Sequence, residues 1–128
     1  MRLLVDTHLL LWAAASSGRL SRGARALIED ADNEVYYSAA SIWEIAIKSG
    51  LGRKDFRVDV PALLAALPRM GFVELPVTGV HAAQVMRLAN IHRDPFDRLL
   101  VAQSIVGPLT LLTNDAVLAR YWDGVRVV

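Results

Sequence analysis

The chain has 128 residues, a length typical of one domain with its own hydrophobic core. Hydrophobic residues make up 54% of it, and the absence of cysteine excludes a disulfide framework and a zinc site built on thiolates. The 14 basic and 13 acidic residues leave a net charge of +1, which is not the strongly basic balance of a dedicated nucleic-acid binder.

The N-terminal half alternates short apolar runs with helical patterns. Residues 1–15 superficially resemble a signal peptide, but Asp6 and His8 interrupt the apolar region, so we expect a mature N-terminal strand. Ser21 is placed to cap a second helix, and Gly50 to end a third. The elements expected here are a strand at 3–5, helices at 9–14 and 22–31, a strand at 34–37 and a helix at 39–49.

The C-terminal half continues this alternation. Asp94 before Pro95 is an N-cap followed by proline at the first helical position, and the following helix is apolar nearly all round, as in a buried helix. Asp59 and Thr78 are placed to start two earlier helices. The elements expected here are a helix at 62–67, a strand at 72–75, helices at 79–89 and 95–105, a strand at 109–113, a short helix from 114 and a strand at 125–128.

Strands that alternate with helices predict one α/β domain over residues 1–128, with a mostly parallel sheet flanked by helices on both faces. No apolar run approaches the ~20 residues that span a bilayer, so we expect a soluble protein with no membrane partner. The lack of cysteine is compatible with a cytoplasmic location.

Three aspartates follow predicted strands or open the buried helix. Asp6 ends the first strand, Asp115 follows the strand at 109–113, and Asp97 lies in the first turn of the apolar helix. Ligands bind outside the carboxyl ends of parallel strands, so these carboxylates are candidates for one site. Each also has a plain alternative as a helix cap, and Asp94-x-x-Asp97 resembles a capping box.

A fourth acid, Glu44, lies in the middle of an apolar helix. Its alternative role is an i,i+4 pair with Lys48 on a solvated edge, yet Ser41, Glu44 and Lys48 form a narrow polar stripe that suits the lining of a cleft. Four acids in one pocket would repel one another without a cation. An all-oxygen set of ligands favours Mg²⁺ or Mn²⁺.

Four motifs, spread over essentially the whole chain, carry a family resemblance. They are Leu4-Val5-Asp6-Thr7-His8, Ser38-x-x-Ser41-x-Trp43-Glu44-Ile45, His92-x-Asp94-Pro95-Phe96-Asp97-Arg98 and Leu112-Thr113-Asn114-Asp115. Together they resemble the PIN-domain ribonucleases and, more narrowly, the VapC-type toxins of bacterial toxin–antitoxin pairs. No acid of the family pattern is missing.

The resemblance implies a PIN-like nuclease domain with a five-stranded sheet ordered 3-2-1-4-5. It implies a Mg²⁺- or Mn²⁺-dependent endoribonuclease whose catalytic, metal-binding acids are Asp6, Glu44, Asp97 and Asp115. It also implies an RNA substrate, a cognate antitoxin that blocks the site, and a homodimer. From the chemistry of phosphodiesters, metal-activated water is expected to leave 5′-phosphate and 3′-hydroxyl ends.

Other polar residues are expected to support the acids or to contact RNA. Asp94 is expected mainly as an N-cap, and Arg98 either to hold a carboxylate or to contact phosphate. The supporting set is Thr7, Ser41, Asp94, Arg98, Thr113 and Asn114. The RNA-contacting set is Lys48, Arg53, Lys54, Arg57 and Arg93, with His8 and His92 as weaker candidates and Trp43 as a stacking surface; the alternative for the charges is a solvated surface.

Two other interpretations account for an acidic α/β domain. A phosphoacceptor receiver domain also binds Mg²⁺ on a parallel sheet, but it needs paired acids after the first strand and a lysine after the last internal strand. Asp6 stands alone, and no lysine follows Lys54. A non-catalytic protein-binding α/β domain, whose acids serve as helix caps, is the main alternative.

Overall fold

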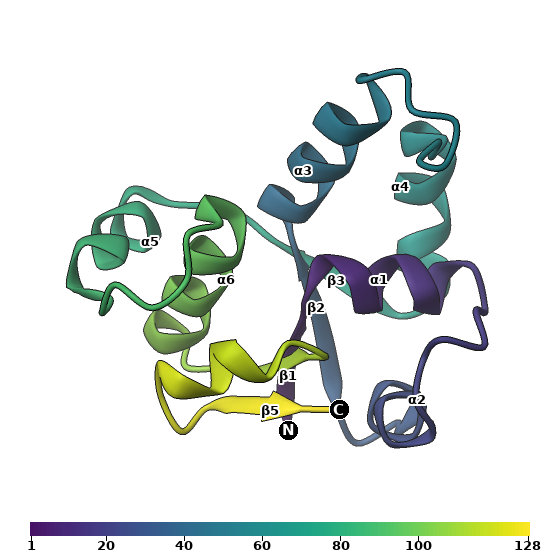
Figure 1. Cartoon of the computed structure of the whole chain (residues 1–128). Coiled ribbons are helices and arrows are strands. Elements are labelled where there is room, and N and C mark those ends of the chain that lie inside the picture. The colour runs from purple at the N-terminus through teal and green to yellow at the C-terminus, as the bar shows by residue number, and fades with distance from the viewer.

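Five strands form one parallel sheet in the order β3-β2-β1-β4-β5 (Figure 1). The computed structural model describes all residues 1–128. Each neighbouring pair of strands is parallel, so the expected order is confirmed and the sheet is parallel throughout. The strands are β1 (Arg2–Val5), β2 (Glu34–Ser38), β3 (Phe72–Leu75), β4 (Thr110–Thr113) and β5 (Val125–Val127).

Six α-helices and two 3₁₀ helices connect the strands. They are α1 (Thr7–Ala14), α2 (Arg22–Glu29), α3 (Ala39–Ser49), α4 (Val60–Arg69), α5 (Gly79–Gln84), η1 (Val85–Arg87), α6 (Pro95–Val106) and η2 (Ala116–Arg120). The expected caps Ser21, Asp59, Thr78 and Asp94 each accept a backbone N–H at the start of their helix. No helix combines the length and apolar character needed to cross a bilayer.

The helix expected over 79–89 ends early, at Gln84, and continues only as the 3₁₀ turn η1. The reason is an arginine from another element. The Arg98 guanidinium donates to the carbonyl oxygens of Val85 (3.3 Å) and Ala89 (3.0 Å). In a continuing α-helix the Val85 carbonyl would accept the N–H of Ala89. Here it accepts the N–H of Leu88 (3.2 Å) in the 3₁₀ turn together with the Arg98 guanidinium.

The central strand β1 is buried on both faces, as expected for a parallel sheet covered by helices. Leu3 and Val5 belong to the larger apolar cluster, with α1, α2, α3 and α4. Leu4 belongs to the smaller cluster, with α6 and η2. All three side chains are fully buried. Burial of such a side chain contributes about 1.5–3 kcal/mol to the stability of the fold. The buried strand β1 therefore holds the residues at its end firmly in place.

All five strands run the same way, so their carboxyl ends lie along one edge of the sheet. Asp6 follows β1 directly, and Asp115 follows β4 after one intervening residue. These two strands are neighbours, with Val5 of β1 opposite Leu112 of β4. The sheet register therefore places the two aspartates beside each other.

Candidate active site

A pocket of about 320 Å³ opens at the carboxyl edge of β1 and β4. Its lining is wholly polar and comes from three separate parts of the chain: Asp6, His8, Asp97, Asn114 and Asp115. Three of the four predicted metal-binding acids therefore share one pocket. Their roles in catalysis remain predictions, but their convergence is a property of the fold.

Asp6 is both a helix cap and a pocket residue. Its Oδ1 accepts the N–H of Leu9 (2.8 Å), and its Oδ2 accepts the hydroxyl of Thr113 (2.6 Å). The side chain is almost fully buried, and this burial raises the pKa of Asp6, while the bond from Thr113 acts in the opposite direction. Thr113 also accepts the N–H of Asp115 (3.0 Å), so one hydroxyl ties two of the acids together.

Glu44 lies on α3, next to the residue that follows Asp6. Its Oε1 accepts the hydroxyl of Thr7 (2.7 Å), and that hydroxyl also lies 2.9 Å from Ser41 Oγ. The expected alternative, an ion pair with Lys48, is present at 2.6 Å, but the Glu44 carboxylate is buried rather than on a solvated edge. The Lys48 ammonium is thus turned to this carboxylate, and its expected contact with RNA stays a prediction.

Asp97 projects from the first turn of α6. The expected capping box is absent, because the N–H of Asp94 donates to Nδ1 of His92 and not to the Asp97 carboxylate. The pKa of Asp97 is raised to about 7, first by burial, then by the negative charges of Asp94, Glu44 and Asp6, and His92 opposes this rise. The influence of Glu44 on this pKa places the fourth acid within electrostatic reach of the pocket.

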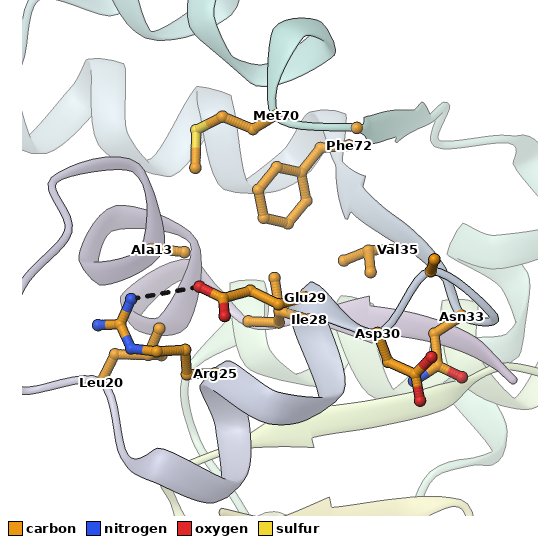
Figure 2. Close-up of a pocket in the computed structure, with 12 residues that line it drawn as sticks. Ala13, Leu20, Arg25, Ile28, Glu29, Asp30, Asn33, Val35, Met70 and Phe72 are labelled. Carbon is orange, nitrogen blue, oxygen red and sulfur yellow. Dashed lines mark ion pairs between the residues drawn. The ribbon is translucent and has the colours of Figure 1, made fainter.

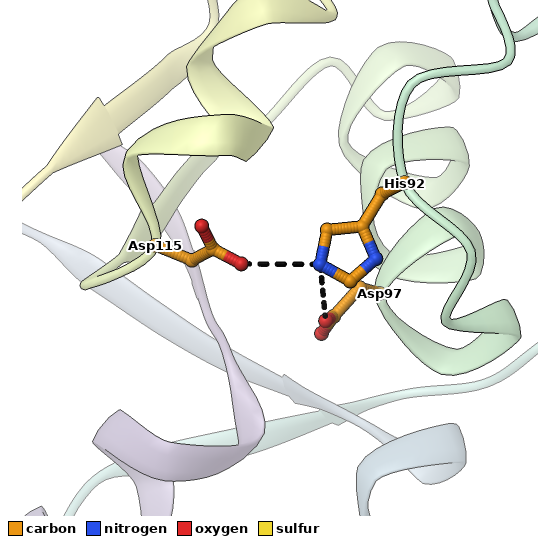
Figure 3. A group of neighbouring side chains, drawn as sticks. All are labelled: His92, Asp97 and Asp115. Atoms are coloured by element: carbon orange, nitrogen blue, oxygen red, sulfur yellow. Dashed lines mark hydrogen bonds and ion pairs between the residues drawn. The ribbon is translucent and has the colours of Figure 1, made fainter.

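His92 lies beside two of the pocket carboxylates, and its expected contact with RNA stays a prediction. Figure 3 shows one ring nitrogen, Nε2, turned to both Asp97 and Asp115. The distances from Nε2 to their Oδ2 atoms are 3.6 Å and 3.2 Å. These three side chains offer ligand atoms within 4.8 Å of one another. One feature of the sequence could have indicated that His92 lies near the acids, namely its close spacing to Asp94 and Asp97.

The remaining supporting residues divide into two groups. Asn114 lines the pocket, whereas Asp94 caps α6 by accepting the N–H groups of Phe96 and Asp97. Arg98 neither holds a carboxylate nor faces the pocket. Its guanidinium donates to the Val85 and Ala89 carbonyls and to the Tyr121 hydroxyl (3.2 Å), because the loop before α6 folds over it.

The expected RNA-contacting charges do not form one surface at the pocket. Arg53, Lys54 and Arg57 are exposed in the connection between α3 and α4, beyond the end of α3 that lies away from the sheet (Figure 1). Arg93 is exposed and directly follows His92. Arg93 is therefore the one member of that set next in sequence to a residue of the carboxylate cluster.

The residues at the pocket fit a hard divalent cation. Asp6, Asp97 and Asp115 present carboxylate oxygens, and no sulfur ligand is available. Mg²⁺ and Mn²⁺ prefer such oxygens and keep several waters, for which this pocket has room. Burial and then the negative charges of Asp94, Glu44 and Asp6 raise the pKa of Asp97, and a cation would offset these charges.

A second pocket, of about 450 Å³, is larger but lies at the other edge of the sheet. Its lining includes Val35 near the start of β2 and Phe72 at the start of β3. Figure 2 shows Arg25 and Glu29 of α2 joined by an ion pair beside it, at 3.6 Å. Parallel sheets bind ligands at the carboxyl ends of their strands, so this amino-edge pocket is not the candidate active site.

The family model of the PIN domain matches residues 3–122. The chain belongs to the PIN-domain family. This PIN domain is 31% identical over 112 residues to Ribonuclease VapC22 of Mycobacterium tuberculosis (strain ATCC 25618 / H37Rv), a match that covers 88% of the chain and 85% of the relative. The resemblance inferred from the four motifs is confirmed.

Solved structures share the fold of this PIN domain. VapBC2 from Rickettsia felis, bound to a DNA fragment from its promoter, is similar with a TM-score of 0.72 and 13% identity, over 100% of this chain and 98% of that chain. PAE2754 from Pyrobaculum aerophilum is similar with a TM-score of 0.59 and 21% identity, over 98% of this chain and 82% of that chain. At these identities the similarity concerns the fold alone.

Proposed function

We propose that this PIN domain is a metal-dependent endoribonuclease and the toxin of a VapC-type toxin–antitoxin pair. The observation that carries the proposal is the convergence of Asp6, Asp97 and Asp115 from three separate parts of the chain on one pocket. Caps alone do not require convergence, since each helix start needs only its own N–H partners. The relation to Ribonuclease VapC22 supports the choice of RNA as substrate.

Asp6, Asp97 and Asp115 hold a Mg²⁺ or Mn²⁺ ion in this proposal, with Glu44 at the side of the pocket. When bound, the ion would supply an acidified water and a counter-charge for the phosphate. The reaction is hydrolysis of the phosphodiester, which leaves 5′-phosphate and 3′-hydroxyl ends. Thr113 keeps Asp6 oriented through its 2.6 Å hydrogen bond. Thr7 does the same for Glu44.

RNA approaches this pocket past α3 and α6. Trp43 is 63% exposed, and its ring meets Phe96 edge-on, with centroids 5.4 Å apart. The chain neighbours of these two rings are Glu44 and Asp97, so the aromatic pair borders the acids. An exposed indole stacks on any base, and the cationic Arg93 beside His92 attracts the phosphate backbone.

The same proposal includes the partners and location expected of a VapC-type toxin. A cognate antitoxin covers the pocket, two copies of the chain form a homodimer, and the protein acts in the cytoplasm. VapBC2 of Rickettsia felis, which is similar over the whole chain, supports the pairing with an antitoxin. Size-exclusion chromatography with light scattering, alone and with the protein encoded beside it, measures both associations.

Cleavage of end-labelled single-stranded RNA tests the activity directly. We expect cutting with Mn²⁺ or Mg²⁺, none with EDTA, and 5′-phosphate ends in the product. Glu44→Gln and Asp97→Asn are expected to abolish cutting. Asp32→Asn is the matched control, because Asp32 is exposed in the turn between α2 and β2, and it is expected to cut as the wild type does.

Four results would count against the proposal. Cutting that is indifferent to EDTA, or 2′,3′-cyclic phosphate ends, excludes metal-assisted hydrolysis. Equal cutting by the wild type and Asp97→Asn identifies a contaminating nuclease. Absence of both cutting and Mn²⁺ binding favours the non-catalytic binding domain.

A further inference from the structure

His92 is held from both sides of its ring and through its backbone. The ring nitrogen Nδ1 accepts the backbone N–H of Asp94 (3.0 Å). The backbone N–H of His92 donates to the hydroxyl of Tyr121 (2.8 Å). Arg98 donates to the same hydroxyl at 3.2 Å. The ring thus faces the pocket in one orientation, and turning it over would break the bond from Asp94.

This arrangement determines which nitrogen carries the proton. A backbone N–H can donate only to a ring nitrogen with a free lone pair, so Nδ1 is unprotonated and the proton of the neutral ring is on Nε2. Nε2 lies 3.2 Å from Asp115 Oδ2, and it therefore donates to that carboxylate. A nitrogen that carries a proton has no lone pair for a metal ion.

We propose that His92 is a positioning residue, which through its Nε2–H holds the Asp115 carboxylate opposite Asp97, and that its ring is not a ligand of the metal ion. The hydrogen bonds of Asp115 support this role because its two oxygens have different partners. Its Oδ1 accepts the N–H of Val117 (3.0 Å), and its Oδ2 faces His92. The two bonds together allow the carboxylate little rotation.

The competing assignment makes the trio of His92, Asp97 and Asp115 a direct nitrogen-and-oxygen metal site, which their proximity permits. It requires the ring to shed its Nε2 proton, and with it the hydrogen bond to Asp115. The two assignments differ in the tautomer of His92 in the presence of metal. They also differ in which substitutions are tolerated, since Gln can supply an N–H donor to Asp115 but has no imidazole nitrogen to give to a metal ion.

The tautomer is measured by long-range ¹H–¹⁵N NMR of the histidine rings, with and without Mg²⁺. We expect His92 in the Nε2–H form in both conditions. His81 is an internal reference, because its Nδ1 also accepts a backbone N–H, from Thr78 (3.0 Å), but its ring belongs to no ion pair. Loss of the Nε2 proton of His92 on addition of Mg²⁺, with His81 unchanged, overturns the proposal.

The second measurement is Mn²⁺ affinity by calorimetry for the wild type, His92→Ala and His92→Gln, each checked for folding by circular dichroism. Loss of an outer hydrogen-bonding partner weakens metal binding by about 10-fold, so we expect this for His92→Ala and near-wild-type affinity for His92→Gln. Equal weakening in both variants, or none in His92→Ala, overturns the proposal.

This inference rests on the proposed function in that a divalent ion occupies the pocket. The two can fail separately. A wild type that binds no Mn²⁺ contradicts the proposed function, whereas a wild type that binds Mn²⁺ only as tightly as His92→Ala contradicts the role of His92 alone. The tautomer of the metal-free protein tests the hydrogen-bond geometry independently of either.

Discussion

At the scale of single residues, the aspartates of this site act as helix caps and as pocket residues at once. Asp6 uses Oδ1 for the start of α1 and Oδ2 for Thr113. Asp115 uses Oδ1 for the start of η2 and Oδ2 for His92. Capping and metal binding, which are alternatives at the level of sequence, are compatible in the fold because a carboxylate has two oxygens with two lone pairs each. The cap fixes the direction in which the second oxygen points.

The raised pKa of Asp97 predicts a pH-dependent stability for the metal-free protein. The folded pKa is about 7 and the ordinary value is 3.8, so between these values the unfolded chain has released a proton that the folded protein retains. Stability therefore falls as the pH rises from about 4 to 7 and is constant above that. We expect Asp97→Asn, which carries no charge, to remove the part of this fall that Asp97 causes and to leave the part that comes from the raised pKa of Asp6.

The size of the effect is limited by solvent, because the Asp97 side chain is 23% exposed. After allowance for screening, we expect Asp97→Asn to raise the free energy of unfolding at pH 8 by about 1–2 kcal/mol in EDTA. Urea unfolding from pH 4 to 8 measures this. A wild type whose stability rises over this interval contradicts the pKa, and Asp32→Asn controls for net charge.

Thr113 links Asp6 to Asp115, and its hydroxyl is fully buried. Thr113→Val keeps the shape but leaves Asp6 and the Asp115 N–H without this partner, so we expect a loss of about 1–3 kcal/mol in the free energy of unfolding. Thr113→Ser retains the hydroxyl and is expected to lose less. Denaturant unfolding of the pair at pH 7 compares them, and equal losses would show that the methyl group matters rather than the hydroxyl.

At the scale of elements, the alternation of strands and helices was predictable because it depends on local patterns. Buried strands are short apolar runs, and most helices begin at a cap that is visible in the sequence. The shortened α5 was not predictable, because Arg98 of α6 donates to the Val85 and Ala89 carbonyls in the segment that follows α5. For the same reason the orientation of His92 was missed, since it depends on Tyr121, 29 residues further along.

Removal of the Arg98 guanidinium is expected to loosen only the segment that it contacts. Arg98→Met keeps much of the side-chain bulk but removes the guanidinium donor, so that the Val85 and Ala89 carbonyls keep only the backbone N–H groups of Leu88 and Ile91. We expect faster hydrogen exchange over residues 85–93, with β1 protected as before, because two of the three hydrogen-bond partners that lose Arg98 lie in that segment. Arg53→Met, at an exposed loop position, is the control. A uniform rise in exchange would mean that Arg98 supports the whole core.

At the scale of the whole molecule, the sheet explains why acids distant in sequence were foreseeable neighbours. The parallel arrangement puts the ends of β1 and β4 on one edge, so the positions of Asp6 and Asp115 follow from topology. Asp97 reaches the same pocket because α6 leads back to the start of β4, so the first turn of α6 lies at the carboxyl edge of the sheet. The side-chain partners of each acid depend on packing details that no sequence pattern specifies.

If three carboxylates from separate parts of the chain hold an ion, as proposed above, that ion stabilises the folded state as a whole. We expect Mn²⁺ at about 100 times its dissociation constant to add about 2.7 kcal/mol, a rise of about 5–15 °C in thermal midpoint for a domain of this size. Differential scanning fluorimetry measures the shift. Asp97→Asn is expected to lose most of it, and an equal shift with NaCl at matched ionic strength would indicate screening instead.

The hydrogen bond between Asp6 and Thr113 joins residues 107 positions apart in the chain. β1 is made before β4 during translation and cannot pair with it until β4 has also left the ribosome. A nascent chain that ends before β4 therefore lacks Thr113, Asn114 and Asp115 and has only one side of its pocket. Completion of the pocket therefore waits for the synthesis of β4 and of the residues that follow it.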